Sequence, residues 1–114
     1  MALEWVRTIC KALPHTTEEV LWGGDLVFKT GGKMYCVTPL EPGGLSLTFK
    51  VPVEEFAELC ERDGVIPAPY MARHHWVALE REGALPRAET RQRIRTSYDL
   101  VRAKLPKKVQ ASLK

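Results

Sequence analysis

Long hydrophobic runs are missing from this sequence. No stretch approaches the roughly 18 consecutive apolar residues that a membrane-spanning helix needs, and no basic segment followed by an apolar run stands near the N-terminus. We therefore expect a cytoplasmic protein without membrane contact. Internal repeats and long linkers are missing as well, and hydrophobic residues make up 45% and charged residues 27%, the proportions of an ordinary globular protein. We expect one domain over residues 1–114, present as a monomer.

Cysteine and histidine are scarce, and their spacing fits neither disulfides nor a metal site. Cys10, Cys36 and Cys60 are an odd number and stand far apart in apolar patterns, which predicts buried thiols. The sequence has no CxxC, HxxxH or HxH motif, and the adjacent His74 and His75 would face opposite sides of a strand. We expect no metal and no cofactor. A nucleophilic pair of Cys36 with His75 is a catalytic alternative, but a cysteine in an apolar strand is more typical of inert packing.

Phosphate-binding loops are missing too. The glycine pairs Gly23-Gly24, Gly31-Gly32 and Gly43-Gly44 stand between expected strands, whereas a phosphate loop needs a GxxxxGKT-type or GxGxxG pattern that leads into a helix. These pairs favour hairpin turns, because glycine accepts a positive φ. No nucleophile, base and orienting group can be named together, and we therefore expect a non-enzymatic binding domain.

Periodicity and turn residues predict helices around a strand meander. Apolar residues three or four apart predict helices over 2–13, 52–62 and 87–105, and proline residues end the first and the last of these. Short runs rich in β-branched and aromatic residues predict strands over 20–22, 26–30, 34–38, 45–50 and 76–79, with one or two strands between the last two helices. The expected fold class is α+β, a two-layer sandwich in which an antiparallel sheet packs against helices.

Positive charge is concentrated in the last third of the chain. Residues 1–80 hold seven Lys or Arg and eleven Asp or Glu, whereas residues 81–114 hold ten and three. Such a segment attracts phosphate by releasing counterions, although a solvated face or a surface for an acidic partner has the same composition. The candidate nucleic-acid-binding residues are Arg91, Arg95 and Arg102 on one margin of the last helix, Arg93 and Lys104 on the other, Lys107 and Lys108 beyond it, Lys29 and Lys33 around the Gly31-Gly32 turn, and Arg73.

Several spaced motifs carry a family resemblance over nearly the whole chain. They are Trp22-Gly23, the hairpin from Asp25 to Tyr35, Ala68-Pro69-Tyr70, His75-Trp76-Val77 and the segment from Ser97 to Val101, in matching order. With these motifs the sequence resembles the MmcQ/YjbR-like proteins. The resemblance implies a compact bacterial α+β domain, shaped like the frataxin-type and secretion-chaperone-type sandwiches, with a double-wing DNA-binding role. It implies no catalytic residue.

These features lead to three functional hypotheses. The leading one is contact with DNA or RNA through the basic C-terminal helix and a hairpin wing. The alternative is a chaperone-like or protein-interaction module whose exposed sheet face or groove takes an acidic or amphipathic peptide. The third is a ligand-binding protein or small enzyme with a pocket near Pro67 to Trp76, where Tyr70 and Trp76 either pack in the core or are offered, beside Arg73, to a base.

Overall fold

An antiparallel sheet with helices on one face makes up the protein, which confirms the expected α+β class. The computed structural model describes residues 3–41 and 43–112. Its elements in chain order are α1 (Leu3–Lys11), β1 (Thr16–Leu21), β2 (Asp25–Thr30), β3 (Lys33–Pro39), β4 (Leu47–Lys50), α2 (Val53–Cys60), β5 (Val65–Pro67), the short 3-10 helix η1 (Ala72–His74), β6 (Trp76–Leu79), α3 (Arg87–Ala103) and α4 (Lys107–Ser112).

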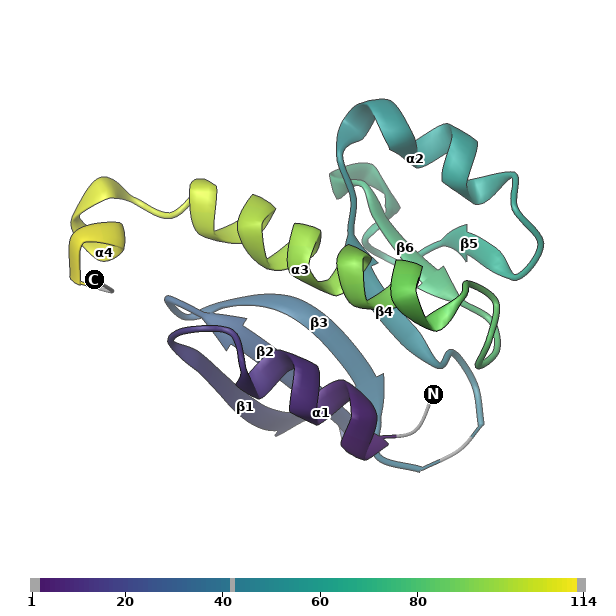
Figure 1. Cartoon of the computed structure of the whole chain (residues 1–114), viewed down its shortest axis with the longest axis horizontal. Coiled ribbons are helices and arrows are strands. Elements are labelled where there is room, and N and C mark those ends of the chain that lie inside the picture. Colours follow the sequence, from purple (N-terminus) through teal and green to yellow (C-terminus); the bar gives the residue numbers. More distant parts are fainter. Residues whose placement is uncertain (1–2, 42, 113–114) are drawn as a thin grey trace.

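The six strands lie in the order β1-β2-β3-β4-β6-β5. The first four follow one another as a meander, and β6 then pairs with β4, which leaves the short β5 at the edge. In Figure 1, α1 lies over the β1–β2 side of the sheet, α3 runs across its middle, and α2 lies beside β5 and β6. In the described part of the chain no helix is long and apolar enough to cross a membrane.

The main core lies between the sheet and the three longer helices. Alternate strand residues face it, because successive side chains of a strand point to opposite faces. The apolar stripe that the spacing predicts on the last helix is confirmed, since Ile94, Tyr98, Val101 and Leu105 are all buried. The helices and strands also bring together Val6 and Cys10 of α1, Leu26 and Phe28 of β2, Leu47 and Phe49 of β4, Leu59 of α2, and Val77 and Leu79 of β6.

A β-bulge in the β2–β3 hairpin turns Tyr35 into this core. Phe28 pairs with Cys36 and Lys29 with Met34, so that Tyr35 is the extra residue of β3. Its hydroxyl lies 2.8 Å from Thr16 Oγ1 and donates to the Cys10 carbonyl oxygen at 3.3 Å, and burial raises the pKa of Tyr35 far above its usual value. Its ring meets that of Tyr98 edge-on, with the ring centroids 5.2 Å apart. One side chain therefore holds α1, β1 and α3 together.

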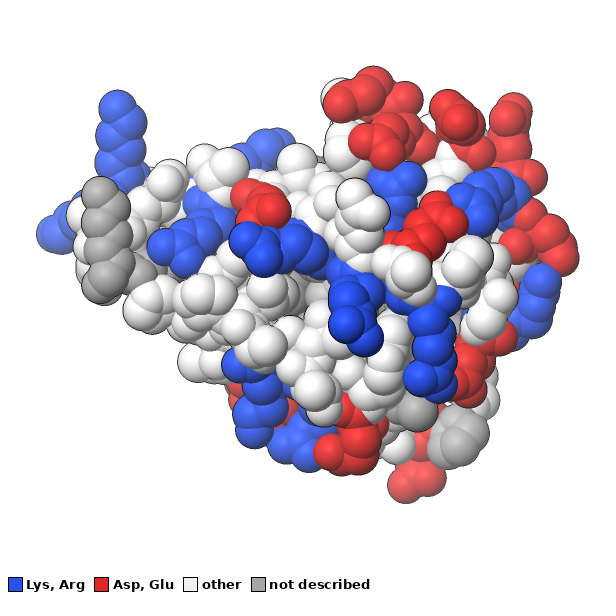
Figure 2. Space-filling model, in the orientation of Figure 1, with Lys and Arg blue, Asp and Glu red and all other residues white. Residues whose placement is uncertain are grey.

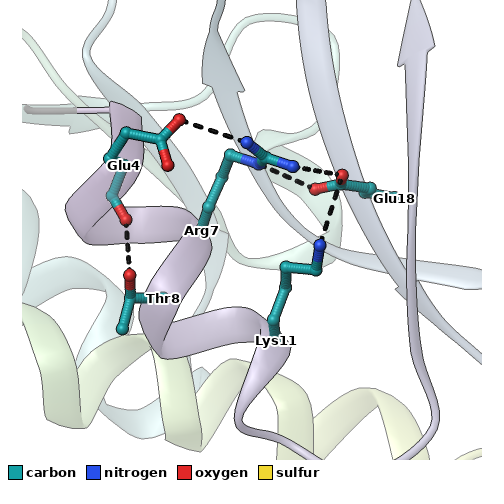
Figure 3. A network of polar contacts seen from close by, with 5 residues as sticks. All are labelled: Glu4, Arg7, Thr8, Lys11 and Glu18. Atoms are coloured by element: carbon teal, nitrogen blue, oxygen red, sulfur yellow. Dashed lines mark hydrogen bonds and ion pairs between the residues drawn. The ribbon is translucent and has the colours of Figure 1, made fainter.

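An ion-pair network fastens α1 to the neighbouring strand (Figure 3). The Arg7 guanidinium donates to both carboxylate oxygens of Glu18 on β1, from Nη2 at 2.7 Å and from Nε at 3.1 Å. Arg7 Nη1 also donates to Glu4 at 3.1 Å, and Lys11 Nζ lies 3.8 Å from Glu18. Hydrogen bonding from Arg7 lowers the pKa of Glu18.

Several elements are shorter than the sequence predicts, and the larger differences lie at the first strand and at the C-terminal end. The first strand spans Thr16–Leu21 instead of 20–22, because Trp22 lies in the turn that follows it, with a φ of 53°. The last long helix ends at Ala103, and the residues after Pro106 form α4, which was not predicted. Pro106 ends one helix and opens the next because proline fits the first turn of a helix, where its carbonyl accepts the Gln110 amide at 3.0 Å.

Candidate nucleic-acid interface

The tip of the β2–β3 hairpin packs against the C-terminal helices. Gly31 has a φ of 59°, and a Cβ atom added there would lie 2.5 Å from Leu105 Cδ1 and 3.2 Å from Val109 Cγ1. A side chain at position 31 would have to displace these side-chain ends, because the hairpin tip lies beside α4 and the last turn of α3 (Figure 1). The contact brings the hairpin residue Lys33 to the same end of the molecule as the C-terminal lysines.

Four exposed lysines define this end, which we call the lysine end: Lys33 of the hairpin, Lys104 at the C-cap of α3, and Lys107 and Lys108 in the first turn of α4. None of the four forms an ion pair with the described part of the chain. Lys107 and Lys108 stand where the helix dipole disfavours a positive charge, so that they do not serve to stabilise α4. In Figure 2 the acidic side chains lie mostly around α2 and along the right-hand and lower edges of the molecule, away from α4.

Lys50, at the end of β4, extends the lysine end toward η1, and sequence reasoning missed it. Its ammonium donates to the His74 carbonyl oxygen at 2.7 Å. Partial burial and the nearby charge of Lys104 lower the pKa of Lys50. Two ammonium groups that repel each other form a place where an anion is stabilised. The only sequence signal was a lysine at the end of an apolar strand, which is common in sheets.

The arginines on the α1 side of α3 each contact a neighbouring side chain. Arg91 is exposed, with its guanidinium carbon 5.8 Å from the centroid of the Trp5 ring. Arg95 Nε lies 3.4 Å from Asp99 Oδ1, as the sequence spacing suggests. Arg102 donates to the Tyr98 hydroxyl at 2.8 Å. This flank therefore carries positive charge, but its arginines already have partners.

The other predicted residues lie away from the lysine end or have an acidic partner. Arg93 faces α2, is 17% exposed and donates to Glu55 at 2.7 Å. Lys29 donates to Glu19 of the neighbouring strand, also at 2.7 Å. Arg73 is exposed on η1, outside the four residues of the lysine end. The structure thus brings together Lys33, Lys104, Lys107 and Lys108 and leaves Arg93 in a link between α2 and α3.

Cys36 and His75 each contact other side chains in the described part of the chain. Cys10 and Cys36 are buried, and a side-chain hydrogen bond between them, together with burial, raises the pKa of the Cys36 thiol. The His75 ring instead lies against Phe56 of α2, with the ring centroids 5.6 Å apart. No three His, Cys, Asp or Glu side chains among residues 3–41 and 43–112 are placed to hold a metal ion.

Comparisons with known proteins place this fold in a family. The YjbR family model matches residues 11–100, a span that ends before Lys104. The crystal structure of Deinococcus radiodurans protein DR2400, which carries the family-model domain DUF419, superposes with a TM-score of 0.87 at 29% identity, over 97% of this chain and 86% of that one. A Pseudomonas syringae protein of known structure has a TM-score of 0.70 at 23% identity, over 88% of this chain and 98% of that one, and shows the fold alone. No curated protein matches the chain.

Proposed function

The chain belongs to the YjbR family, and we propose that it is a non-enzymatic domain that binds duplex DNA through the lysine end. The observation that carries this proposal is the contact of Gly31 with Leu105 and Val109, because it joins a hairpin and two helix ends into one basic surface. A hairpin tip and a helix end that project together can contact phosphates on both sides of a groove.

The chemistry of the lysine end suits phosphates better than bases. Ammonium groups on flexible stems act as point charges and make contacts that do not depend on base sequence. Lys50 and Lys104, whose charges repel each other, would share one phosphate between them. We therefore propose binding with modest sequence preference and a strong dependence on salt, since each neutralised phosphate releases counterions.

Fluorescence anisotropy of a labelled DNA duplex tests this function. The variant Lys104→Gln/Lys107→Gln/Lys108→Gln should bind at least about tenfold more weakly at low salt, and its slope of log K against log salt should fall by roughly 2.7, about 0.9 for each lost phosphate contact. The control Arg62→Gln/Arg81→Gln/Arg87→Gln removes the same charge around α2 and the start of α3, and it should bind within about threefold of the parent.

Two outcomes would contradict the proposal. Equal losses in both variants would mean that net charge, not the lysine end, drives association. No binding of the parent protein even at low salt would leave the lysines as a solvated surface. Single-stranded DNA and RNA of the same length are compared in the same titration. If either binds more tightly than the duplex, it replaces duplex DNA as the proposed ligand.

The groove between α1 and α3 favours a second candidate, the binding of an acidic amphipathic peptide. A hollow of about 500 Å³ there has an apolar floor with basic margins, and its lining includes Trp5, Ile9, Leu13, Arg91 and Arg95. An amphipathic helix could place its apolar face on this floor and its carboxylates against the arginines. An acidic amphipathic peptide should then change the tryptophan fluorescence, and Arg91→Gln/Arg95→Gln should weaken its binding about tenfold. An unchanged affinity in that variant would exclude this groove.

A further inference from the structure

The face of the sheet turned away from α1 and α3 is hollowed at one end. Val37 and Thr48 pair across β3 and β4 and alternate with the core residues Cys36 and Phe49, so that they point to this opposite face. The segment between β5 and β6 folds over the same face, where Trp76 is buried with Ala68 and Ala78. The hollow has a volume of about 530 Å³, within the range of small-ligand pockets, and is lined by Trp22, Asp25, Met34, Val37, Leu45, Thr48, Ala68, Pro69, Tyr70 and Met71.

Two aromatic side chains of this lining, Trp22 and Tyr70, are held at turn positions of positive φ, which bulky residues rarely occupy. The Gly24 amide donates to the Leu21 carbonyl at 3.3 Å, and Trp22 and Gly23 between them have φ values of 53° and 79°. These are the two positive φ angles of a type I′ hairpin turn, whose first central position favours asparagine, aspartate or glycine. A tryptophan here is not explained by turn chemistry.

The second turn repeats this arrangement from another part of the chain. The Met71 amide donates to the Ala68 carbonyl at 3.1 Å. Between these two residues stand Pro69 and then Tyr70, which has a φ of 66°. That is the pattern of a type II turn, in which the second position favours glycine. Core packing does not explain the two aromatics either, because Trp22 is 66% exposed and Tyr70 is fully exposed.

All the residues that line the hollow lie in the described part of the chain. Among them Asp25 is the only charged one. Asp25 is half-buried, and its side chain forms no hydrogen bond or ion pair with the described residues. A carboxylate beside apolar and aromatic surface attracts a positive charge, and aromatic faces attract one as well. A ligand that suits this lining therefore carries a positive charge on an apolar body.

We infer that this hollow binds a small organic cation, an ammonium group carried on an aromatic or alkyl body. The body lies on Met34, Val37 and Met71, the ammonium group faces Asp25, and the Trp22 and Tyr70 rings cover it from the rim. This site is independent of DNA binding, because it lies on the other face of the sheet from α3 and its lining contains no lysine or arginine.

Phenylethylammonium is a suitable probe, and 2-phenylethanol is its uncharged control. Titration followed by amide chemical shifts should give a dissociation constant on the order of 1 mM for the cation, with shifts centred on residues 22–25, 37 and 68–71. The alcohol should bind at least about fivefold more weakly. Asp25→Asn should remove that difference, because it removes the charge that distinguishes the two probes.

Variants at the rim separate a binding role from a structural one. Trp22→Gly and Tyr70→Gly should each weaken phenylethylammonium binding about threefold or more without lowering the unfolding midpoint, because glycine suits both turns. Val53→Ala, at an exposed apolar residue of α2, is the matched control. It should change neither the binding of phenylethylammonium nor the unfolding midpoint. The inference is overturned if the cation causes no shifts at tens of millimolar, if the alcohol binds equally well, or if Asp25→Asn leaves the difference intact.

Discussion

Four described residues other than glycine have a positive φ, namely His15, Trp22, Tyr70 and His75. Histidine is comparatively tolerant of this conformation, and the His75 amide closes η1 by donating to the Ala72 carbonyl at 2.9 Å. For bulky aromatic residues the left-handed conformation costs about 1–2 kcal/mol. Trp22 and Tyr70 accept that strain while exposing their rings, and such strain concentrates at ligand-binding sites.

The Arg7–Glu18 pair makes stability depend on pH. Arg7 lowers the pKa of Glu18 in the native state, so that at low pH the unfolded chain binds this proton more readily than the folded one. The contribution is complete above the usual glutamate pKa and is lost as the pH falls through the lowered native value. We expect Glu18→Gln to be less stable than the parent at about pH 7 and the gap to narrow at about pH 3, measured by urea unfolding.

A matched variant distinguishes the pair from a general effect of acid. Glu19→Gln removes a carboxylate from the same strand whose partner is Lys29, in a more exposed pair, and its effect on stability should be small at both pH values. A gap between Glu18→Gln and the parent that stays constant with pH would show that the charge of Glu18 contributes nothing to the link between α1 and β1.

At the scale of elements, α3 connects the core to two candidate surfaces, the lysine end and the groove between α1 and α3. Its buried Ser97 hydroxyl donates to the Tyr35 carbonyl on β3 and accepts the Lys50 amide on β4 at 2.9 Å, which fixes the helix across these two strands. One flank of the helix then borders α1, the other binds α2 through Arg93, and its C-terminal end meets the hairpin. The docking of one helix therefore positions both the groove and the lysine end.

The packing of the hairpin on α4 predicts different effects for two adjacent glycines. Gly31→Ala and Gly32→Ala both place alanine at a positive φ, but only at position 31 does the new Cβ meet Leu105 and Val109. We expect Gly31→Ala to be destabilised by about 1–3 kcal/mol more than Gly32→Ala in urea unfolding. Gly31→Ala should also bind DNA more weakly than Gly32→Ala, because it separates Lys33 from the lysines of α4.

The outcome of that comparison bears directly on the proposed interface. Equal stability of the two variants would mean that the hairpin tip can move away from α4 without lowering the free energy of unfolding. Equal DNA affinity despite a difference in stability would mean that Lys33 and the C-terminal lysines act separately.

Element boundaries show where local reasoning was sufficient. The stripe of α3, the glycine turns and the return of β6 to the sheet were predicted, because helical periodicity and turn residues act over a few neighbours. The sequence predicts the first strand too late because Thr16 to Glu19 are polar: Thr16 and Glu18 are half-buried, whereas Thr17 and Glu19 are exposed. The sequence does not predict α4, because Pro106 by itself indicates only the end of the preceding helix.

At the scale of the whole molecule, charge is separated along the fold. Acidic side chains are densest around α2, while a row of basic side chains follows α3 to α4 (Figure 2). The sequence already indicated this asymmetry, since the last 34 residues hold most of the positive charge. It did not indicate that Glu55 neutralises Arg93, which depends on α2 lying beside α3.

The sequence by itself determined the α+β class, the family, the buried stripe of α3 and the sign of charge at the C-terminal end, because each depends on residues near one another along the chain. Only the tertiary structure decided that Lys33 joins Lys104, and that Trp22, Asp25 and Tyr70 line one hollow. Strand order and helix docking bring these distant segments together. The lysine end and the hollow therefore each include residues whose proximity no local pattern predicts.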